Sequence, residues 1–153
     1  MPILRQWAER HPAKIAARIA LSDEAITYGE LDRRAGAVSQ LLTEKGLAAG
    51  DGVAILLDND LTYFEIVFGA RRHGVYYTPI STHLTPDEAA YIVRDSGARI
   101  LFVASRFADV VAALKADNPN RCAVYVVGGD SADDFDYLSE RDRFNGLIDV
   151  TDG

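Results

Sequence analysis

Short apolar segments alternate with amphipathic helical segments between residues 26 and 127, and this alternation most restricts the possible folds. Residues 53–57 are apolar on both faces, as expected of a central strand that is covered on both sides. Further strands are expected at residues 76–80, 99–103 and 122–127, each separated from the next by a helical segment. Such repetition implies right-handed crossovers. The sequence therefore predicts an α/β fold with a mostly parallel sheet and helices on both faces.

The helix expected after Thr27 has the clearest start and stop signals. Thr27 at the N-cap and Glu30 three residues later form the pattern of a capping box, in which each side chain satisfies a backbone amide of the other residue. Gly46 is placed to end the helix in the left-handed conformation. Ile26 and Leu31 flank the start as a hydrophobic staple, and the buried face is expected to carry Leu31, Ala35, Val38 and Leu42.

Three more helices complete the alternation. Residues 58–60 offer cap oxygens to a helix over residues 61–73, whose last turn carries two arginines and a histidine. Thr85, Pro86 and Glu88 open the next helix, which Gly97 ends. A last helix is expected over residues 107–115.

The two ends of the sequence differ from this pattern. Residues 4–10 predict a short helix, and residues 15–20 and 25–27 predict a small β-hairpin around a polar turn. Residues 128–153 contain seven aspartates, and we expect a loop with a turn of helix at residues 135–138 and a disordered end. We thus expect an α/β subdomain over residues 1–127 and an acidic, loop-rich tail over residues 128–153.

Charge and composition exclude several classes of function. The 153 residues carry 16 basic and 23 acidic side chains, a net charge of −7, and no basic run that could bind a nucleic acid. No apolar stretch approaches the roughly 20 residues of a membrane span, and the N-terminus lacks the features of a signal peptide. Cys122 is the only cysteine, which excludes an internal disulfide and fits the cytoplasm, where we expect the protein.

Four motifs in register resemble the opening of the adenylate-forming, AMP-binding acyl-CoA synthetases. Residues 26–31 (ITYGEL) are similar to the family's L-T-Y-x-E-L, and residues 74–80 (GVYYTPI) to its G-A-x-x-x-P-(I/L/V). Leu84 and Glu88 match the L-x-x-x-E of the family's N/D-x-x-L-x-x-x-E, with a departure before them at Thr82, and residues 95–99 (DSGAR) resemble its D-S-(G/E)-(A/P)-(K/R). The resemblance covers the chain from Trp7 to about Val127. It implies the N-terminal subdomain of the acyl-CoA synthetase-like fold.

The same resemblance implies what the complete enzyme does. Such an enzyme uses ATP and Mg²⁺ to activate a fatty or aryl carboxylic acid as acyl-AMP and then transfers the acyl group to coenzyme A. The family's phosphate loop of Ser, Thr and Gly ending in Pro-Lys-Gly would lie downstream of residue 153, because none of Lys14, Lys45 and Lys115 adjoins such a cluster. We therefore expect this chain to be an N-terminal fragment, inactive alone, whose partners are the downstream subdomains.

No catalytic residue and no metal ligand is assigned, and the candidates for binding are two. Arg106 follows the strand at residues 99–103, where some relatives place a basic residue near the coenzyme A 3′-phosphate; the other interpretation is a solvated surface arginine. His83 precedes a capped helix on what resembles the substrate side of the family fold. Asp58 is expected to cap a helix, His73 to interact with a helix dipole, and His11 to be structural.

A second function remains open from the sequence. The chain could instead be a stand-alone binding or assembly module that has kept the scaffold without the chemistry. A sheet of this kind has an exposed edge, which favours homo-oligomers. The acyl substrate is not predicted, since in this family the acyl pocket is formed mainly by downstream residues. No dinucleotide-binding glycine fingerprint is present, which disfavours an unrelated nucleotide-binding domain.

Overall fold

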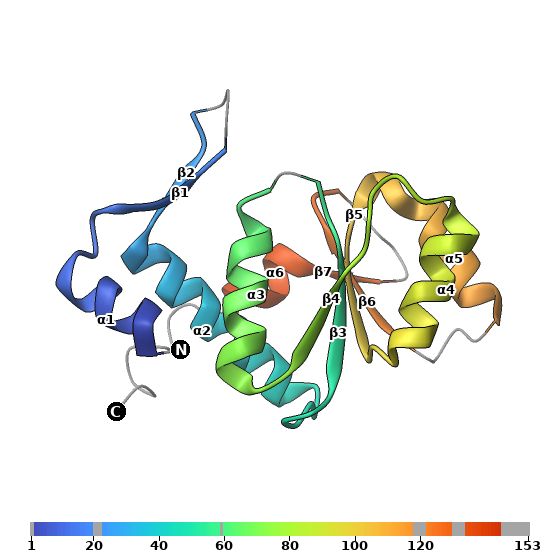
Figure 1. The fold of residues 1–153 in the computed structure, drawn as a ribbon, viewed down its shortest axis with the longest axis horizontal. Coiled ribbons are helices and arrows are strands. Elements are labelled where there is room, and N and C mark those ends of the chain that lie inside the picture. The colour runs from blue at the N-terminus through green and yellow to red at the C-terminus, as the bar shows by residue number, and fades with distance from the viewer. Residues whose placement is uncertain (1, 20–22, 59, 118–121, 130–133, 145–153) are drawn as a thin grey trace. The chain divides into compact units, whose positions relative to one another are not determined.

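The computed structural model describes residues 2–19, 23–58, 60–117, 122–129 and 134–144. These residues form two compact units (Figure 1). Among the described residues, the first unit comprises residues 2–19, 23–48, 60–74 and 141–144, and the second comprises residues 49–58, 75–117, 122–129 and 134–140. The predicted end of the tail, residues 145–153, and the predicted hairpin turn at residues 20–22 lie outside the described residues.

The first unit combines a small hairpin with helices. Helix α1 (Pro2–Arg10) precedes the antiparallel strands β1 (Ile15–Arg18) and β2 (Ala25–Thr27), which confirms the predicted hairpin. Helix α2 (Tyr28–Glu44) starts directly after β2 and packs along α3 (Thr62–His73). The four residues predicted to form the apolar stripe of α2 are all buried, and Ile26 and Leu31 share one hydrophobic cluster as the staple requires.

The start of α2 differs from the prediction in one respect. The Thr27 hydroxyl accepts a hydrogen bond from the Glu30 amide at 3.2 Å, which is one half of a capping box. The Glu30 carboxylate, however, accepts hydrogen bonds from Arg33 and from Arg34. Both arginines lie one turn further along the same helix, so they take the carboxylate that the reciprocal bond would need. The complete capping box occurs instead at Thr85 and Glu88.

Helix α3 is joined to its surroundings by a close approach and by a buried ion pair. A Cβ added to Gly69 would lie 2.5 Å from Val38 Cβ, so α2 and α3 pack at a distance that only glycine permits. Glu65 is fully buried, and its carboxylate lies 3.1 Å from the guanidinium of Arg141, which is 8% exposed. Removing either partner would leave a buried charge uncompensated.

The second unit is a parallel sheet with strand order β4-β3-β5-β6-β7. Its strands are β3 (Gly52–Leu56), β4 (Tyr76–Pro79), β5 (Ile100–Ala104), β6 (Ala123–Val127) and β7 (Phe135–Asp136). Helix α4 (Pro86–Ser96) connects β4 to β5, and the 3₁₀ turn η1 (Ser105–Phe107) and helix α5 (Ala108–Asp117) connect β5 to β6. The α/β class and the parallel sheet are confirmed. The turn of helix predicted at residues 135–138 starts two residues later and is longer, as α6 (Tyr137–Asp142), and the strand β7, which extends the sheet at residues 135–136, was not predicted.

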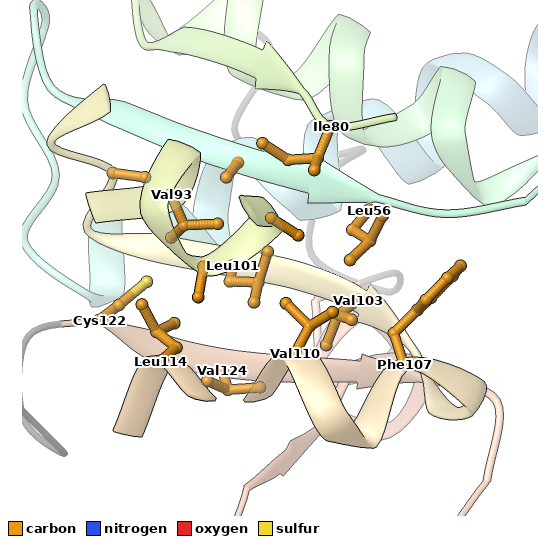
Figure 2. Packing of buried hydrophobic residues seen from close by; sticks show 14 of the residues in the cluster. Leu56, Ile80, Val93, Leu101, Val103, Phe107, Val110, Leu114, Cys122 and Val124 are labelled. Carbon is orange, nitrogen blue, oxygen red and sulfur yellow. The ribbon is translucent and has the colours of Figure 1, made fainter. Parts of the chain in front are cut away.

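Both faces of this sheet are covered by side chains of the same unit. On one face, residues of α4 and α5 meet Leu101 and Val103 of β5 and neighbouring strand residues in a single cluster (Figure 2). On the other face, the Phe102 ring lies 5.6 Å from the ring of Tyr125 and 5.6 Å from that of Tyr137, at the start of α6. Alternation along β5 thus places successive residues in two separate cores, as a central strand requires.

Candidate functional site

The carboxyl ends of the five parallel strands lie along one side of the sheet in the second unit. Strand β3 lies between β4 and β5, so the chain passes from β3 to β4 on one side and then to β5 on the other. The order of the strands therefore reverses at the boundary between β3 and β5. Open α/β sheets bind ligands outside the carboxyl ends of the strands at such a point.

An ion pair spans this boundary. Asp58 follows the end of β3 by two residues, and Arg106 follows the end of β5 by two residues. The Arg106 Nε donates to Asp58 Oδ2 at 2.7 Å, and its Nη2 donates to Asp58 Oδ1 at 2.6 Å. The two side chains are 47% and 57% exposed, so this bidentate pair faces solvent. This ion pair therefore lies where the order of the strands reverses.

The pair influences the ionisation of both groups, and a ring fixes the position of the guanidinium. Hydrogen bonding to Arg106 lowers the pKa of Asp58, and the same hydrogen bonds raise the pKa of Arg106. The Arg106 guanidinium carbon lies 4.0 Å from the centroid of the Phe107 ring, a cation–π distance. Phe107 belongs to the buried cluster of this unit. The guanidinium is therefore held by a residue anchored in the core and by a carboxylate exposed to water.

The loop after β6 approaches the same strand end. Gly128 and Gly129 have φ values of +73° and +111°, which residues with a side chain rarely adopt. A Cβ on Gly129 would lie 2.9 Å from the Cβ of Ser105, which precedes Arg106. The two glycines thus allow the β6 loop to reach the β5 loop.

His83 lies at the same edge, after β4, but β3 separates β4 from β5. The His83 side chain is exposed, and its amide donates to the Ser81 hydroxyl at 3.2 Å. The structure thus places both candidate residues at one edge, on strands that are not neighbours. It brings Arg106 together with Asp58 instead.

Residues 58–60 were predicted to offer a cap oxygen to α3, and the pairing of Asp58 with Arg106 was not predicted. Asp60 provides that oxygen, accepting a hydrogen bond from the Thr62 amide at 2.8 Å. The sequence does show that Asp58 and Arg106 each stand just beyond the end of a predicted strand, but the pairing of those two strands comes from the fold. Leu56 is paired with Val103 in that register.

The other titratable residues considered, His73, His11 and Cys122, contact neighbouring parts of the fold. His73 Nε2 donates to the Leu47 carbonyl at 2.7 Å, and its Nδ1 lies 3.4 Å from the Ser39 hydroxyl, so both ring nitrogens contact neighbouring segments. The His11 ring lies 5.5 Å from the Trp7 ring. Cys122 is buried, and that burial raises the pKa of its thiol to about 12, so the thiol stays protonated.

The described residues also bear on metal ions and membranes. Within the part of the chain that the structure describes, no group of three or more His, Cys, Asp or Glu side chains could hold a metal ion. Among the helices described, none combines the length and the apolar character that crossing a bilayer requires.

Comparisons with known proteins give a consistent family. The fatty acid–[acyl-carrier-protein] ligase ScoC of Streptomyces coeruleorubidus is 37% identical over 94 residues, covering 61% of this chain and 18% of ScoC. The long-chain-fatty-acid–CoA ligase FadD13 of Mycobacterium tuberculosis (strain ATCC 25618 / H37Rv) is 29% identical over 131 residues, covering 82% of this chain and 26% of FadD13. The chain thus spans about a fifth to a quarter of these relatives.

Solved structures and the family model extend the match over nearly the whole chain. The crystal structure of the N-terminal domain of FACL13 from Mycobacterium tuberculosis superposes with a TM-score of 0.76 at 30% identity. That match covers 92% of this chain and 35% of the solved one. The family model described as AMP-binding enzyme matches residues 4–148. This chain therefore belongs to the family of AMP-binding enzymes.

Proposed function

We propose that this chain forms the N-terminal part of an ATP-dependent ligase that activates a fatty or aryl carboxylic acid as acyl-AMP and transfers it to coenzyme A. The family match over residues 4–148 carries the proposal. The names of the relatives FadD13 and ScoC, both fatty-acid ligases, support a fatty acid as the substrate class. The two names differ in the acceptor, coenzyme A or an acyl-carrier protein.

The proposal assigns the reaction partners to different parts of the ligase. ATP and Mg²⁺ would be held by regions outside this chain, since its three lysines adjoin no Gly, Ser and Thr cluster that could cradle a triphosphate. Arg106 would contact a phosphate of coenzyme A, because an exposed guanidinium at the reversal of strand order suits that group. His83 would lie on the acyl-substrate side. The downstream subdomains would be the partners of residues 1–127, with residues 128–153 as the acidic connection.

A chimera tests the proposal. Residues 4–148 replace the matched segment of FadD13, and the purified chimera is assayed for carboxylate-dependent exchange of pyrophosphate into ATP and for acyl-CoA formation. Both activities are expected in the chimera, and neither is expected from the 153-residue chain alone. The matched control is FadD13 lacking that segment.

Each assay has an outcome that contradicts the proposal. A chimera that folds but exchanges no pyrophosphate would show that the chain does not supply a working N-terminal part. Pyrophosphate exchange by the isolated chain would overturn its predicted inactivity. Transfer to an acyl-carrier protein in place of coenzyme A would show that the acceptor is the one named for ScoC and would contradict coenzyme A as the acceptor.

One observation favours the second candidate function, a stand-alone assembly module. Strand β4 is an outer strand of the described sheet, and Tyr76 on it is 73% exposed. Unpaired outer strands favour pairing with a second chain. Sedimentation of the isolated chain over a range of concentrations distinguishes a homo-oligomer from a monomer. The cytoplasm is the proposed location, because the chain has a single buried thiol and no disulfide.

A further inference from the structure

The Asp58–Arg106 pair occupies one edge of the guanidinium that an anionic ligand could use. Asp58 engages Nε and Nη2, one of the two pairs of donors through which a guanidinium binds a carboxylate or a phosphate bidentately. A phosphate approaching Arg106 along that edge meets the Asp58 carboxylate first. The two anions cannot share the same donors, and their like charges repel each other.

The pair is also easy to separate. Both side chains are largely exposed, and exposed ion pairs contribute little to the stability of a fold. The Phe107 ring, 4.0 Å from the guanidinium carbon, lies in the core cluster and keeps the arginine in place when the carboxylate leaves. Exchange of Asp58 for another anion thus needs no rearrangement of the strands that carry the pair.

We propose that Asp58 acts as an internal competitor for Arg106, so that an anion binds at this edge only by displacing the Asp58 carboxylate. The proposal rests on the proposed role of Arg106 in contacting the phosphate of the acyl acceptor. Its ligand class is the phosphate monoester, whose two charges and three acceptor oxygens compete with a carboxylate better than a singly charged anion does. Asp58 therefore lowers the affinity of Arg106 for anions in general and favours phosphate over singly charged anions.

The purified chain provides a direct test. Binding of adenosine 3′,5′-bisphosphate, which carries the 3′-phosphate of coenzyme A, and of inorganic phosphate is measured by NMR titration at constant ionic strength. Asp58→Asn removes the competing charge at similar size, and Arg106→Gln removes the guanidinium. Asp58→Asn is expected to tighten both ligands by about 2- to 10-fold, the scale of an exposed ion pair plus a removed repulsion. Arg106→Gln and the double variant are expected to bind equally weakly.

The chain offers a matched control at the amino ends of the same two strands, β3 and β5. Asp51 precedes β3, Arg99 precedes β5, and they form an exposed pair at 3.1 Å. Asp51→Asn changes the net charge by the same amount as Asp58→Asn but should leave both affinities unchanged. Equal tightening in the two variants would mean that only the overall charge matters, which would overturn the proposal.

The remaining outcomes separate the inference from the proposed role of Arg106. If Arg106→Gln weakens binding while Asp58→Asn has no effect, Arg106 binds phosphate without competition and only the inference fails. If Arg106→Gln binds as well as the unchanged chain, the role of Arg106 in the proposed function fails and the inference fails with it. Absence of binding by both the unchanged chain and Asp58→Asn also overturns the inference. Circular dichroism of each variant checks that the fold is retained.

Discussion

At the scale of single residues, Gly69 sets how closely α3 lies against α2. An alanine there would place its Cβ 2.5 Å from Val38 Cβ and 2.9 Å from the Ala35 carbonyl oxygen. In an open helix, glycine to alanine stabilises by up to about 1 kcal/mol, so helix propensity and packing oppose each other here. Overpacking of a close contact costs about 1–3 kcal/mol and is expected to win. Gly69→Ala should therefore lower the free energy of unfolding in urea.

A double variant shows whether the close contact is the cause. Val38→Gly removes both the Cβ and the methyl group of Val38 that the new Cβ would meet, at the cost of a cavity in the core and of helix propensity. The combined variant should be less destabilised than the sum of the two single variants. A combined loss equal to that sum would mean that Gly69 matters for another reason.

The residues of the candidate site were less predictable than those of the helix faces. Leu31 and Val38 could be assigned to the core from spacing alone, because a periodic pattern depends on the segment itself. Arg106 could be selected only through a family resemblance, and its partner Asp58 lies 48 positions away. That partnership depends on β3 and β5 being neighbours in parallel register, which no local pattern encodes.

At the scale of elements, the helices and strands with strong local signals were predicted to within a few residues. Helix α4 has its capping box and its terminal glycine, and Gly97 has the left-handed φ of +72° that such an end requires. Strand β7 was missed because it is two residues long and is defined by its pairing with β6. Phe135 stacks on Tyr125 at a centroid distance of 4.8 Å, so tertiary contact decides this strand.

The cap of α4 leads to a prediction at this scale. The Thr85 hydroxyl accepts a hydrogen bond from the Glu88 amide, and the Glu88 carboxylate accepts one from the Thr85 amide. Thr85→Ala removes the first bond and should lower the free energy of unfolding by about 1 kcal/mol. Thr85→Ser keeps the hydroxyl and should retain nearly all of the stability. Urea unfolding checks both, and equal losses in the two variants would exclude the hydroxyl as the cause.

At the scale of the whole molecule, the residues that identify the family are separate from the residues that could bind a ligand. Thr27 and Leu31 start a helix, and Gly74, with φ of +79°, ends another. Arg106 and Asp58 stand at strand ends, where side chains face solvent without being required by the core. Packing therefore accounts for the motifs that identify the family. Residues at the strand ends can differ between family members without disturbing the core, so they can change which ligand is bound.

The acid stability of the whole chain follows from its carboxylates. Partial burial raises the pKa of Glu30, but hydrogen bonds and charge from Arg33 and Arg34 outweigh it, and the net pKa lies below the ordinary 4.5. Hydrogen bonding to Arg106 lowers the pKa of Asp58, and hydrogen bonding to Thr85 lowers that of Glu88. The unfolded chain therefore binds these protons more readily than the folded chain does. Their stabilising contribution is complete above the unfolded-state values and is lost as the pH falls through the folded-state values.

Net charge acts in the same range, and its sign separates the two effects above the isoelectric point, whereas below that point the growing positive charge adds to the loss and the Glu30→Gln variant separates them. The charge of −7 at pH 7 approaches zero near the isoelectric point of 4.9, so self-repulsion weakens over that interval and cannot explain a loss of stability there. We expect the urea midpoint to hold or rise from pH 7 to about pH 5 and to fall between about pH 4.5 and pH 3. Glu30→Gln should be less stable at pH 7 and lose less on acidification, because its side chain no longer titrates. A midpoint that falls steadily from pH 7, or an unchanged acid slope in Glu30→Gln, would contradict the assignment of acid stability to these paired carboxylates.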